Sequence, residues 1–320
     1  MVEAYPMKIL VTDKSAEEAL DVFRNAGHDL TYDEMDGETL LKEIPAYDAL
    51  MVRSRTKVVT EIVQAGAKGN LKVIGRAGVG VDNIDIQTAK KEGIKVVNAP
   101  TGSTQSVAEL AFGHMLAMFR FLPAADTSMK QGKWLKKQFK GSELYQKTLG
   151  LIGSGNIAQH AAAIGKGFGM NILVYSPRCT DEKAKRMGAT RVSLEELLKQ
   201  ADVVSLHVPH TKETHYLLDE KQLLMMKPTA YLINCSRGGV VNEKALYNVL
   251  KDKKIAGATV DVYESEPASE DNPLLTLDNI LLTPHIGANT KEAQIRAGTI
   301  TAEQMLMVLE GKEPDFWVNK

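Results

Sequence analysis

The sequence predicts an α/β protein of two domains, each built around a mostly parallel sheet. Short runs rich in Val, Ile and Leu alternate with helix-length segments along the whole chain, which is typical of successive strand–helix units. The 320 residues exceed what one hydrophobic core usually holds, so two domains are expected. Two segments with Pro and Gly, Asn98–Gly102 and Thr283–Gly287, suit hinges. If both are hinges, one domain is inserted into the other.

The expected strands are short, apolar and bounded by turn residues. In chain order they are 9–12, 49–52, 73–74, 96–98, 149–152, 172–175, 203–206, 231–234, 257–260 and 280–283. The expected helices lie between them, at 16–25, 107–121, 157–168, 194–199, 243–251 and 291–310. Several of these helices end next to a glycine, such as Gly169 or Gly311, which is a common helix stop signal.

Composition and charge exclude several classes of protein. A net charge of -1 gives no overall attraction to nucleic acid or to an anionic membrane. The two cysteines, Cys179 and Cys235, lack metal-ligand spacing, so neither a disulfide framework nor a metal site is expected. The N-terminus lacks a secretion signal, and the longest apolar stretch, 107–122, is interrupted by charged residues. These observations favour a cytoplasmic protein.

A glycine-rich turn indicates a dinucleotide site. The segment Gly153–Ala158 reads G-x-G-x-x-A and lies between an expected strand and an expected helix, as the dinucleotide fingerprint requires. Gly153 allows the tight turn, Gly155 lets the backbone approach a pyrophosphate, and Ala158 lets the helix pack closely on the strand. The pyrophosphate would then lie on the free N–H groups at the helix N-terminus.

The residues after the second strand of this unit bear on the choice between NAD and NADP. An acid is expected there to bond the ribose 2′-OH of NAD, and this chain has Ser176 instead. Without that carboxylate a 2′-phosphate is not repelled, and Arg178 can pair with it, so the sequence favours NADP over NAD. The alternative is that Arg178 is solvated or stacks on adenine.

Three polar segments each follow an expected strand and so meet at the carboxyl edge of a sheet: 234–243, 260–267 and 283–288. They contribute Arg237, Glu266 and His285. A planar guanidinium holds a substrate carboxylate bidentately and polarises the neighbouring carbonyl. Histidine donates a proton near neutral pH, and a carboxylate partner orients its ring. These three residues therefore suit hydride transfer to a 2-oxo acid.

With these motifs in this order, the chain resembles the D-isomer-specific 2-hydroxyacid dehydrogenase family over nearly its whole length. The segments N-C-S-R-G-G, D-V-Y-E-S-E-P and T-P-H-I-G and the glycine turn carry the resemblance. It implies two Rossmann-like lobes: a doubly wound cofactor domain at 100–286, inserted into a flavodoxin-like substrate domain at 1–99 and 287–320. It also implies a cleft between the lobes, a homodimer formed through the cofactor domain, and Arg237, Glu266 and His285 as the catalytic triad.

The resemblance also implies a set of cofactor contacts. Asp261 would bind the nicotinamide carboxamide. The remaining implied contacts are Gly153, Gly155, Asn156, Ile157, Ser176, Arg178, His207, Pro209, Thr214, Cys235 and Gly287. The other histidines, His114 among them, are expected to be structural or solvated.

Basic residues in the N-terminal part point to an anionic substrate. Arg53, Arg55, Lys57 and Arg76 supply cations, and Gly78 and Gly80 flank a cluster of backbone N–H groups that can receive a carboxylate. A phosphorylated substrate needs two such anion sites. These segments look most like the phosphoglycerate dehydrogenase branch of the family, which implies 3-phosphoglycerate as substrate. The implied substrate contacts are Arg53, Ser54, Arg76, Val79, Gly80 and Lys136, the last reaching into the neighbouring subunit's site.

Two departures keep other functions open. The chain ends at Lys320 without a regulatory extension, and Ser176 replaces the acid of NAD-preferring members. The second departure makes an NADPH-dependent glyoxylate/hydroxypyruvate reductase the main alternative. A second alternative is a corepressor-like protein that senses the cofactor without turnover, and the basic cluster can also be read as a solvated loop. The three intact catalytic positions favour an enzyme.

Overall fold

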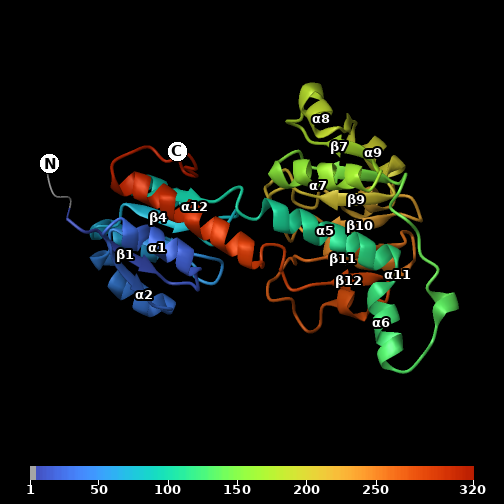
Figure 1. Cartoon of the computed structure of the whole chain (residues 1–320), viewed down its shortest axis with the longest axis horizontal. Helices are drawn as coiled ribbons and strands as arrows, with labels where there is room; N and C mark the ends of the chain where they lie inside the picture. The colour runs from blue at the N-terminus through green and yellow to red at the C-terminus, as the bar shows by residue number, and fades with distance from the viewer. Residues whose placement is uncertain (1–4) are drawn as a thin grey trace. The chain divides into compact units, whose positions relative to one another are not determined.

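The structure, a computed structural model, describes residues 5–320. The chain divides into two compact units (Figure 1). One, here called the terminal unit, consists of the residues up to Thr104 together with Ala288–Lys320. The other, the inserted unit, is Gln105–Gly287.

The terminal unit contains a five-stranded sheet with the order β2-β1-β3-β4-β5, and all its strand pairs are parallel. The strands are β1 (Lys8–Val11), β2 (Asp29–Tyr32), β3 (Ala49–Val52), β4 (Val73–Arg76) and β5 (Lys95–Asn98). The helices are α1 (Glu17–Asn25), α2 (Gly37–Glu43), α3 (Thr60–Lys68), α4 (Ile86–Lys91) and α12 (Lys291–Leu309), with a short 3-10 helix at Ile44–Ala46.

Helices cover both faces of this sheet because the strands are apolar on both sides. Ile9 and Met51 pack with α1 and α12, whereas Leu10 and Leu50 pack with α2, α3 and α4. In Figure 1, α12 runs beside α1 although the two helices come from opposite ends of the chain. Gly298 allows this close packing, since a Cβ there would lie 2.7 Å from the Cβ of Ala19. The C-terminal part of the chain is therefore part of this core.

The inserted unit contains a seven-stranded parallel sheet with the order β12-β11-β10-β9-β6-β7-β8. The strands are β6 (Thr148–Ile152), β7 (Asn171–Tyr175), β8 (Thr190–Arg191), β9 (Val203–Leu206), β10 (Tyr231–Asn234), β11 (Gly257–Val260) and β12 (Ile280–Leu282). The helices are α5 (Thr104–Phe119), α6 (Leu122–Lys130), α7 (Asn156–Gly167), α8 (Asp181–Met187), α9 (Leu194–Gln200), α10 (Glu220–Leu223) and α11 (Glu243–Lys251), with 3-10 turns at Lys136–Gln138 and Pro273–Thr276.

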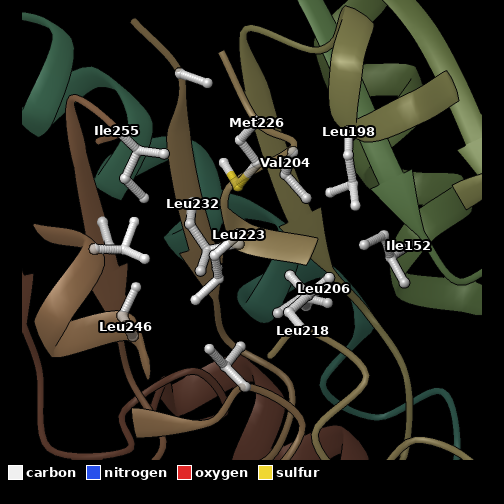
Figure 2. Close-up of a cluster of buried hydrophobic side chains, with 14 of the residues drawn as sticks. Ile152, Leu198, Val204, Leu206, Leu218, Leu223, Met226, Leu232, Leu246 and Ile255 are labelled. Carbon is white, nitrogen blue, oxygen red and sulfur yellow. The ribbon is translucent and has the colours of Figure 1, made fainter. Parts of the chain in front are cut away.

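Two buried clusters, one on each face, hold this second sheet. Figure 2 shows the cluster in which Leu198 of α9, Leu223 of α10 and Leu246 of α11 pack on sheet residues such as Val204 and Leu232. The opposite face is covered by α5, α7 and α8. The order of strands reverses between β6 and β9, and ligands of doubly wound sheets bind at the carboxyl edge beside such a switch point.

The predicted class, two parallel-sheet α/β units, is confirmed, and the differences are local. The predicted helix 107–121 ends early: α5 stops at Phe119, and α6 begins at Leu122 after Phe121, which has a left-handed backbone (φ 54°). Pro123 has no N–H to continue the helix, and the freed carbonyl of Phe119 accepts a hydrogen bond from Ser142 N (3.0 Å) instead. Strands β2 and β8 and several short helices were not predicted, because their apolar runs are too brief to show a period.

Across residues 5–320, no single helix is long and apolar enough to cross a membrane; α5 and α6 meet that test only as a pair, and they bend by 62° at their junction.

Candidate active site

The glycine turn after β6 has two glycines in different environments. Gly153 has φ 113°, and a Cβ there would lie 2.3 Å from the carbonyl oxygen of His207, so the protein's own backbone requires glycine. At Gly155 a Cβ would meet no other described atom within 4 Å. Gly155 precedes α7 and has no side chain to cap it, so the first N–H groups of α7 remain available to a ligand. This space and these donors fit a pyrophosphate group.

The two glycines give a matched pair of variants. Gly155→Val is expected to weaken cofactor binding by about 100-fold or more, because the side chain fills the space of the pyrophosphate and removes its contacts with the helix. Its melting temperature should stay close to that of the wild type. Gly153→Ala is expected to lower the melting temperature, because its Cβ meets His207. Nicotinamide fluorescence titration and thermal unfolding check both; equal cofactor affinity in Gly155→Val and wild type would contradict the assignment.

His285 and Glu266 form the central contact of the site. His285 follows β12 and Glu266 follows β11, and Nδ1 of His285 lies 2.6 Å from Oε2 of Glu266. The second carboxylate oxygen, Oε1, accepts a hydrogen bond from Tyr263 N (3.0 Å). Both side chains are partly exposed, at 47% and 37%, so solvent and a ligand can reach the imidazole.

The electrostatics keep Glu266 ionised. Partial burial raises the pKa of Glu266, but the hydrogen bonds from His285 and Tyr263 N lower it, and the charges of His285 and Arg237 lower it further. The net effect is a pKa below the ordinary value. Glu266 therefore remains a carboxylate throughout the neutral range, and it can hold the imidazole of His285 by Nδ1 with Nε2 left for a substrate.

Arg237 is placed near this pair by the loop after β10. Asn234 organises the loop: its Oδ1 accepts from Ser236 N and Ser236 Oγ (3.1 and 2.8 Å), and its Nδ2 donates to Arg237 O (3.2 Å). A Cβ at Gly238 would lie 1.8 Å from the carbonyl oxygen of Tyr263, so glycine is needed for the loops after β10 and β11 to approach each other. The arginine, glutamate and histidine thus come together within one unit.

Asp261 lies just beyond β11 and binds the turn that carries His285. Its carboxylate accepts hydrogen bonds from Thr283 Oγ1 (2.7 Å), Ile286 N (2.8 Å) and Gly287 N (2.9 Å), and the residue is only 1% exposed. His285 itself has a left-handed backbone, with φ 51°. A non-glycine residue is held in that region only by surrounding contacts, and Asp261 supplies them.

The remaining predicted cofactor residues lie along the same edge of the sheet. Ser176 and Arg178 follow β7, and His207, Pro209 and Thr214 follow β9. The pKa of Glu213 is lowered mainly by the hydrogen bond from Thr211 and, to a smaller extent, by the positive charge of Arg178. Because Arg178 acts on Glu213, the loops after β7 and β9 lie near each other. Thr214 Oγ1 donates to Pro209 O (2.6 Å) and shapes the second loop. Asn156 and Ile157 form the first turn of α7, whereas Cys235 is buried, which raises the pKa of its thiol.

His207 is held as a neutral ring beneath the glycine turn. Burial lowers its pKa to about 4, and its Nε2 lies 2.9 Å from Ser205 Oγ. The residue as a whole is only partly buried, but its Nδ1 is fully buried and has no hydrogen-bond partner among residues 5–320. A neutral imidazole suits the neighbourhood of a helix N-terminus, where a second positive charge would be costly.

In the terminal unit, Asp13 organises the basic loop after β3. Asp13 is 2% exposed, and its carboxylate accepts hydrogen bonds from Arg53 N, Thr56 N and Thr56 Oγ1. It also forms an ion pair with Nε of Arg55 (3.1 Å). Arg55 also donates to the carbonyl of Thr12. The sequence predicts Arg55 as a cation for the substrate, but the structure uses it within the loop. The guanidinium of Arg53 donates to the carbonyl of Lys14 (2.9 Å), and Ser54 is exposed on the same loop.

Arg76 is the last residue of β4 and Val79 follows it, and β4 is the neighbour of β3 in the sheet. The guanidinium of Arg76 covers Gly78, where a Cβ would lie 1.4 Å from Nη1, so this glycine is required for the arginine's position. Asn98 Nδ2 donates to Val79 O (2.6 Å) and fixes the turn that leads to Gly80. Lys136 belongs to the inserted unit, where it is exposed on a 3-10 turn. The structure therefore places the predicted substrate residues in two units.

Three functional details escaped prediction from the sequence. Asp13 follows β1 at its carboxyl end, the same signal that singled out Arg237, and so could have been found. Gly238 and Asn234 act through contacts with a loop distant in sequence, which no local pattern indicates.

The inserted unit thus has the features of a dinucleotide-binding α/β domain that carries an arginine and an acid-paired histidine. Residues 112–287 match the family described as D-isomer specific 2-hydroxyacid dehydrogenase, NAD binding domain. The chain belongs to this D-2-hydroxyacid dehydrogenase family.

Individual relatives extend the similarity to the terminal unit. A D-3-phosphoglycerate dehydrogenase from Methanocaldococcus jannaschii is 50% identical over 314 residues, which are 98% of this chain and 59% of that protein. This chain thus spans less than two thirds of that relative. A hydroxypyruvate reductase from Thermotoga maritima is 43% identical over 305 residues, covering 94% of this chain and 98% of that protein. The crystal structure of the TT0316 protein from Thermus thermophilus matches with a TM-score of 0.87 at 34% identity, covering 98% of this chain and 100% of that one.

Proposed function

We propose that the protein is a nicotinamide-dependent D-2-hydroxyacid dehydrogenase with His285 as the proton donor and acceptor. The observation that carries this proposal is the 2.6 Å contact between His285 and Glu266, in the same unit as the glycine turn and Arg237. Family membership supports the same reaction class. When bound, the nicotinamide supplies a hydride to C2 of a 2-oxo acid or takes one from a 2-hydroxy acid.

The chain's own residues perform the proton transfer and the orientation. In reduction, Nε2 of His285 donates a proton to the C2 oxygen, and Glu266 stabilises the cationic imidazole and keeps it in place. Arg237 holds the substrate carboxylate in its planar fork and withdraws charge from the adjacent carbonyl. In oxidation, His285 takes the proton back. Asp261 keeps the histidine turn in the required conformation, and we assign it to the carboxamide of the nicotinamide from the family resemblance.

The substrate that the residues favour is 3-phosphoglycerate, oxidised at C2 to 3-phosphohydroxypyruvate. This substrate has two anionic groups. The terminal unit offers Arg53 and Ser54 on the loop after β3, and Arg76, Val79 and Gly80 at the end of β4 and just after it. Lys136 would serve the neighbouring subunit's site. The similarity to phosphoglycerate dehydrogenases supports this choice. The alternative is hydroxypyruvate reduction, which is favoured by the Thermotoga maritima reductase that this chain matches over almost its full length.

A substrate panel distinguishes the two activities. We would measure kcat/KM for 3-phosphoglycerate, hydroxypyruvate, glyoxylate and D-lactate, each with NAD and NADP in the appropriate redox state. If the protein is a phosphoglycerate dehydrogenase, kcat/KM should be largest for 3-phosphoglycerate. Arg53→Ala should then lower kcat/KM for 3-phosphoglycerate far more than kcat/KM for hydroxypyruvate. If hydroxypyruvate reduction with NADPH is the fastest reaction by a wide margin, the substrate assignment is wrong and the alternative holds.

We infer a preference for NADP from the residues beyond β7. Ser176 carries no negative charge, Arg178 is exposed close to it, and a hollow of about 370 Å³ at this end of the strand is lined by Ser176, Arg191 and Glu196 among others. The carboxylate of Glu196 accepts the N–H and hydroxyl of Ser193 (2.9 and 2.7 Å), and Arg191 also contacts Asp181 (3.1 Å). A 2′-phosphate would meet no carboxylate on residue 176, and the exposed guanidinium of Arg178 is two residues further along the chain, which favours NADP over NAD.

Ser176→Asp tests this preference. A new carboxylate close to a 2′-phosphate is expected to lower kcat/KM for NADP by about 10- to 100-fold and to leave or improve the value for NAD, because like charges at close range cost several kcal/mol. Kinetics with both cofactors give the ratio. Ser193→Asp, at the edge of the hollow, is a matched control with a smaller expected effect. A wild type that strongly prefers NAD would contradict the inference.

The inserted unit exposes several large apolar side chains on α6 and on the segment that follows it. Leu122 and Met129 of α6 are each 53% exposed, and Trp134 is 77% exposed on the segment that extends from this unit (Figure 1). Large exposed apolar groups of this kind are typical of interfaces. We propose that the protein forms a homodimer and that Leu122, Met129 and Trp134 lie in its interface. Light scattering after gel filtration should give twice the chain mass of 35.0 kDa, and Trp134→Glu should give a monomer.

A further inference from the structure

A buried histidine on α5 connects the carboxyl ends of three strands in the inserted unit. His114 is 3% exposed. Its Nδ1 lies 3.1 Å from Thr259 Oγ1 of β11 and 3.7 Å from the sulfur of Cys235, which follows β10. Its Nε2 lies 3.3 Å from Oγ1 of Thr283, which follows β12. The sequence pattern suggests only a structural or solvated role for this residue, because it occupies an apolar helix.

The hydrogen bonds fix which nitrogen of His114 carries the proton. The hydroxyl of Thr283 donates its single proton to Asp261 Oδ1, at 2.7 Å. It can therefore only accept from His114, which requires a proton on Nε2. Nδ1 is then an acceptor and can receive the hydroxyl proton of Thr259. This assignment follows from counting donors and acceptors.

Burial also favours the neutral form of the ring. Burial lowers the pKa of His114, and the nearby charge of Asp261 raises it by a smaller amount, so the net shift is downward. A neutral imidazole has one N–H and one acceptor nitrogen, and both are used here. The chain of hydrogen bonds then runs in one direction, from Thr259 through His114 and Thr283 to the carboxylate of Asp261.

The hydrogen-bond chain from Thr259 to Asp261 ends at the turn that carries His285. The carboxylate of Asp261 accepts the N–H groups of Ile286 and Gly287, the two residues after His285. Thr283, two residues before His285, also accepts a backbone bond from His285 N (3.1 Å) and donates its own N–H to Val260 O (3.0 Å). The left-handed backbone at His285 is thus enclosed by contacts that depend on Asp261 and Thr283. Among these partners, His114 alone comes from a helix.

We infer that His114 is a positioning residue, which acts through Thr283 and Asp261 as a neutral Nε2–H tautomer to hold the turn that carries His285. The inference rests on the proposed role of His285 in proton transfer. His114 touches neither substrate nor cofactor in this scheme. Its contribution is to fix the direction of the Thr283 hydroxyl, and thereby the carboxylate that binds the turn.

Four variants test the route of this effect. His114→Leu removes the donor, and kcat should fall by about 10- to 100-fold, the usual result of misplacing a catalytic group slightly. His114→Gln places an amide N–H near the position of Nε2 and should restore most of the rate. Thr283→Val should lower kcat to a similar extent, and the double variant with His114→Leu should be no slower than the slower single variant, because both break one chain. Met115→Leu, a buried neighbour on α5, is the control for packing and should leave kcat unchanged.

A spectroscopic readout makes the test independent of turnover. The ¹⁵N chemical shifts of the imidazole in histidine-labelled protein, assigned by comparison with His114→Gln, should show a neutral ring protonated on Nε2 at pH 7.5, above the ordinary pKa of histidine. A ring protonated on Nδ1 at that pH, a ring protonated on both nitrogens, or additive effects of His114→Leu and Thr283→Val on kcat would overturn the inference. If the wild type turns over no 2-hydroxy acid or 2-oxo acid at all, the proposed function fails, and the tautomer still tests the hydrogen-bond chain.

Discussion

Replacing His285 with alanine is expected to lower kcat by about 10²- to 10⁴-fold, the usual contribution of a general acid or base. Alanine removes the imidazole that we propose exchanges a proton with the C2 oxygen, whereas the glycine turn and α7 remain intact. The dissociation constant for the cofactor should therefore change little. Steady-state kinetics and nicotinamide fluorescence titration on the same preparation separate the two effects.

Two further variants show whether the loss is specific to the histidine–carboxylate pair. Glu266→Gln keeps the shape of the side chain but loses the charge that stabilises the protonated imidazole, so a smaller loss of kcat, about 10- to 100-fold, is expected. His28→Ala changes a histidine of the terminal unit whose Nδ1 accepts a hydrogen bond from Met7 N (3.3 Å), and it should be neutral for catalysis. Near wild-type turnover by His285→Ala would remove this residue from the mechanism.

Arg237→Ala is expected to lower kcat/KM for a 2-oxo acid by about 10²- to 10³-fold, because the proposed charge-assisted, bidentate contact with the substrate carboxylate would be lost. The charge of Arg237 also helps to keep the pKa of Glu266 low, so part of the loss should appear in kcat. Arg237→Lys retains the charge but not the planar fork and should recover only part of the activity.

The control for Arg237 is Arg186→Ala, which removes an exposed arginine of α8 in the same unit and should leave kcat/KM unchanged. The substrate carboxylate also provides a control, since a 2-oxo amide cannot use the guanidinium fork in the same way. The wild type should discriminate strongly between the acid and its amide, and Arg237→Ala should do so weakly. Equal discrimination by both proteins would show that the carboxylate binds elsewhere.

The fold could be predicted because its strongest signals are local. Each central strand, such as β6 or β10, is buried on both sides, and so is read as a continuous apolar run. Edge strands lack this property: β8 has two residues, both exposed, and β2 has no fully buried residue. The break between α5 and α6 could be suspected from Pro123, but its position depends on the contact of Phe119 with Ser142.

The sequence pattern singles out the residues of the candidate site, but it does not indicate the contacts that position them. Arg237, Glu266 and His285 stand out because each follows a strand, and parallel strands bring their carboxyl ends to one edge. The approach of the loops depends on Gly238 against Tyr263, and the conformation of His285 depends on Asp261. Contacts between residues so distant in the chain have no local sequence period, which is why the role of His114 was not expected.

The most direct test of the central claim is the product formed from a 2-oxo acid and nicotinamide cofactor deuterated at C4. We would determine the position of the deuterium by mass spectrometry and NMR and the configuration at C2 by chiral chromatography. The account predicts deuterium at C2 of a D-2-hydroxy acid, formed by the wild type and lost at least about 100-fold in rate in His285→Ala. An L-product, a product without deuterium at C2, or no reduction of any 2-oxo acid would contradict it.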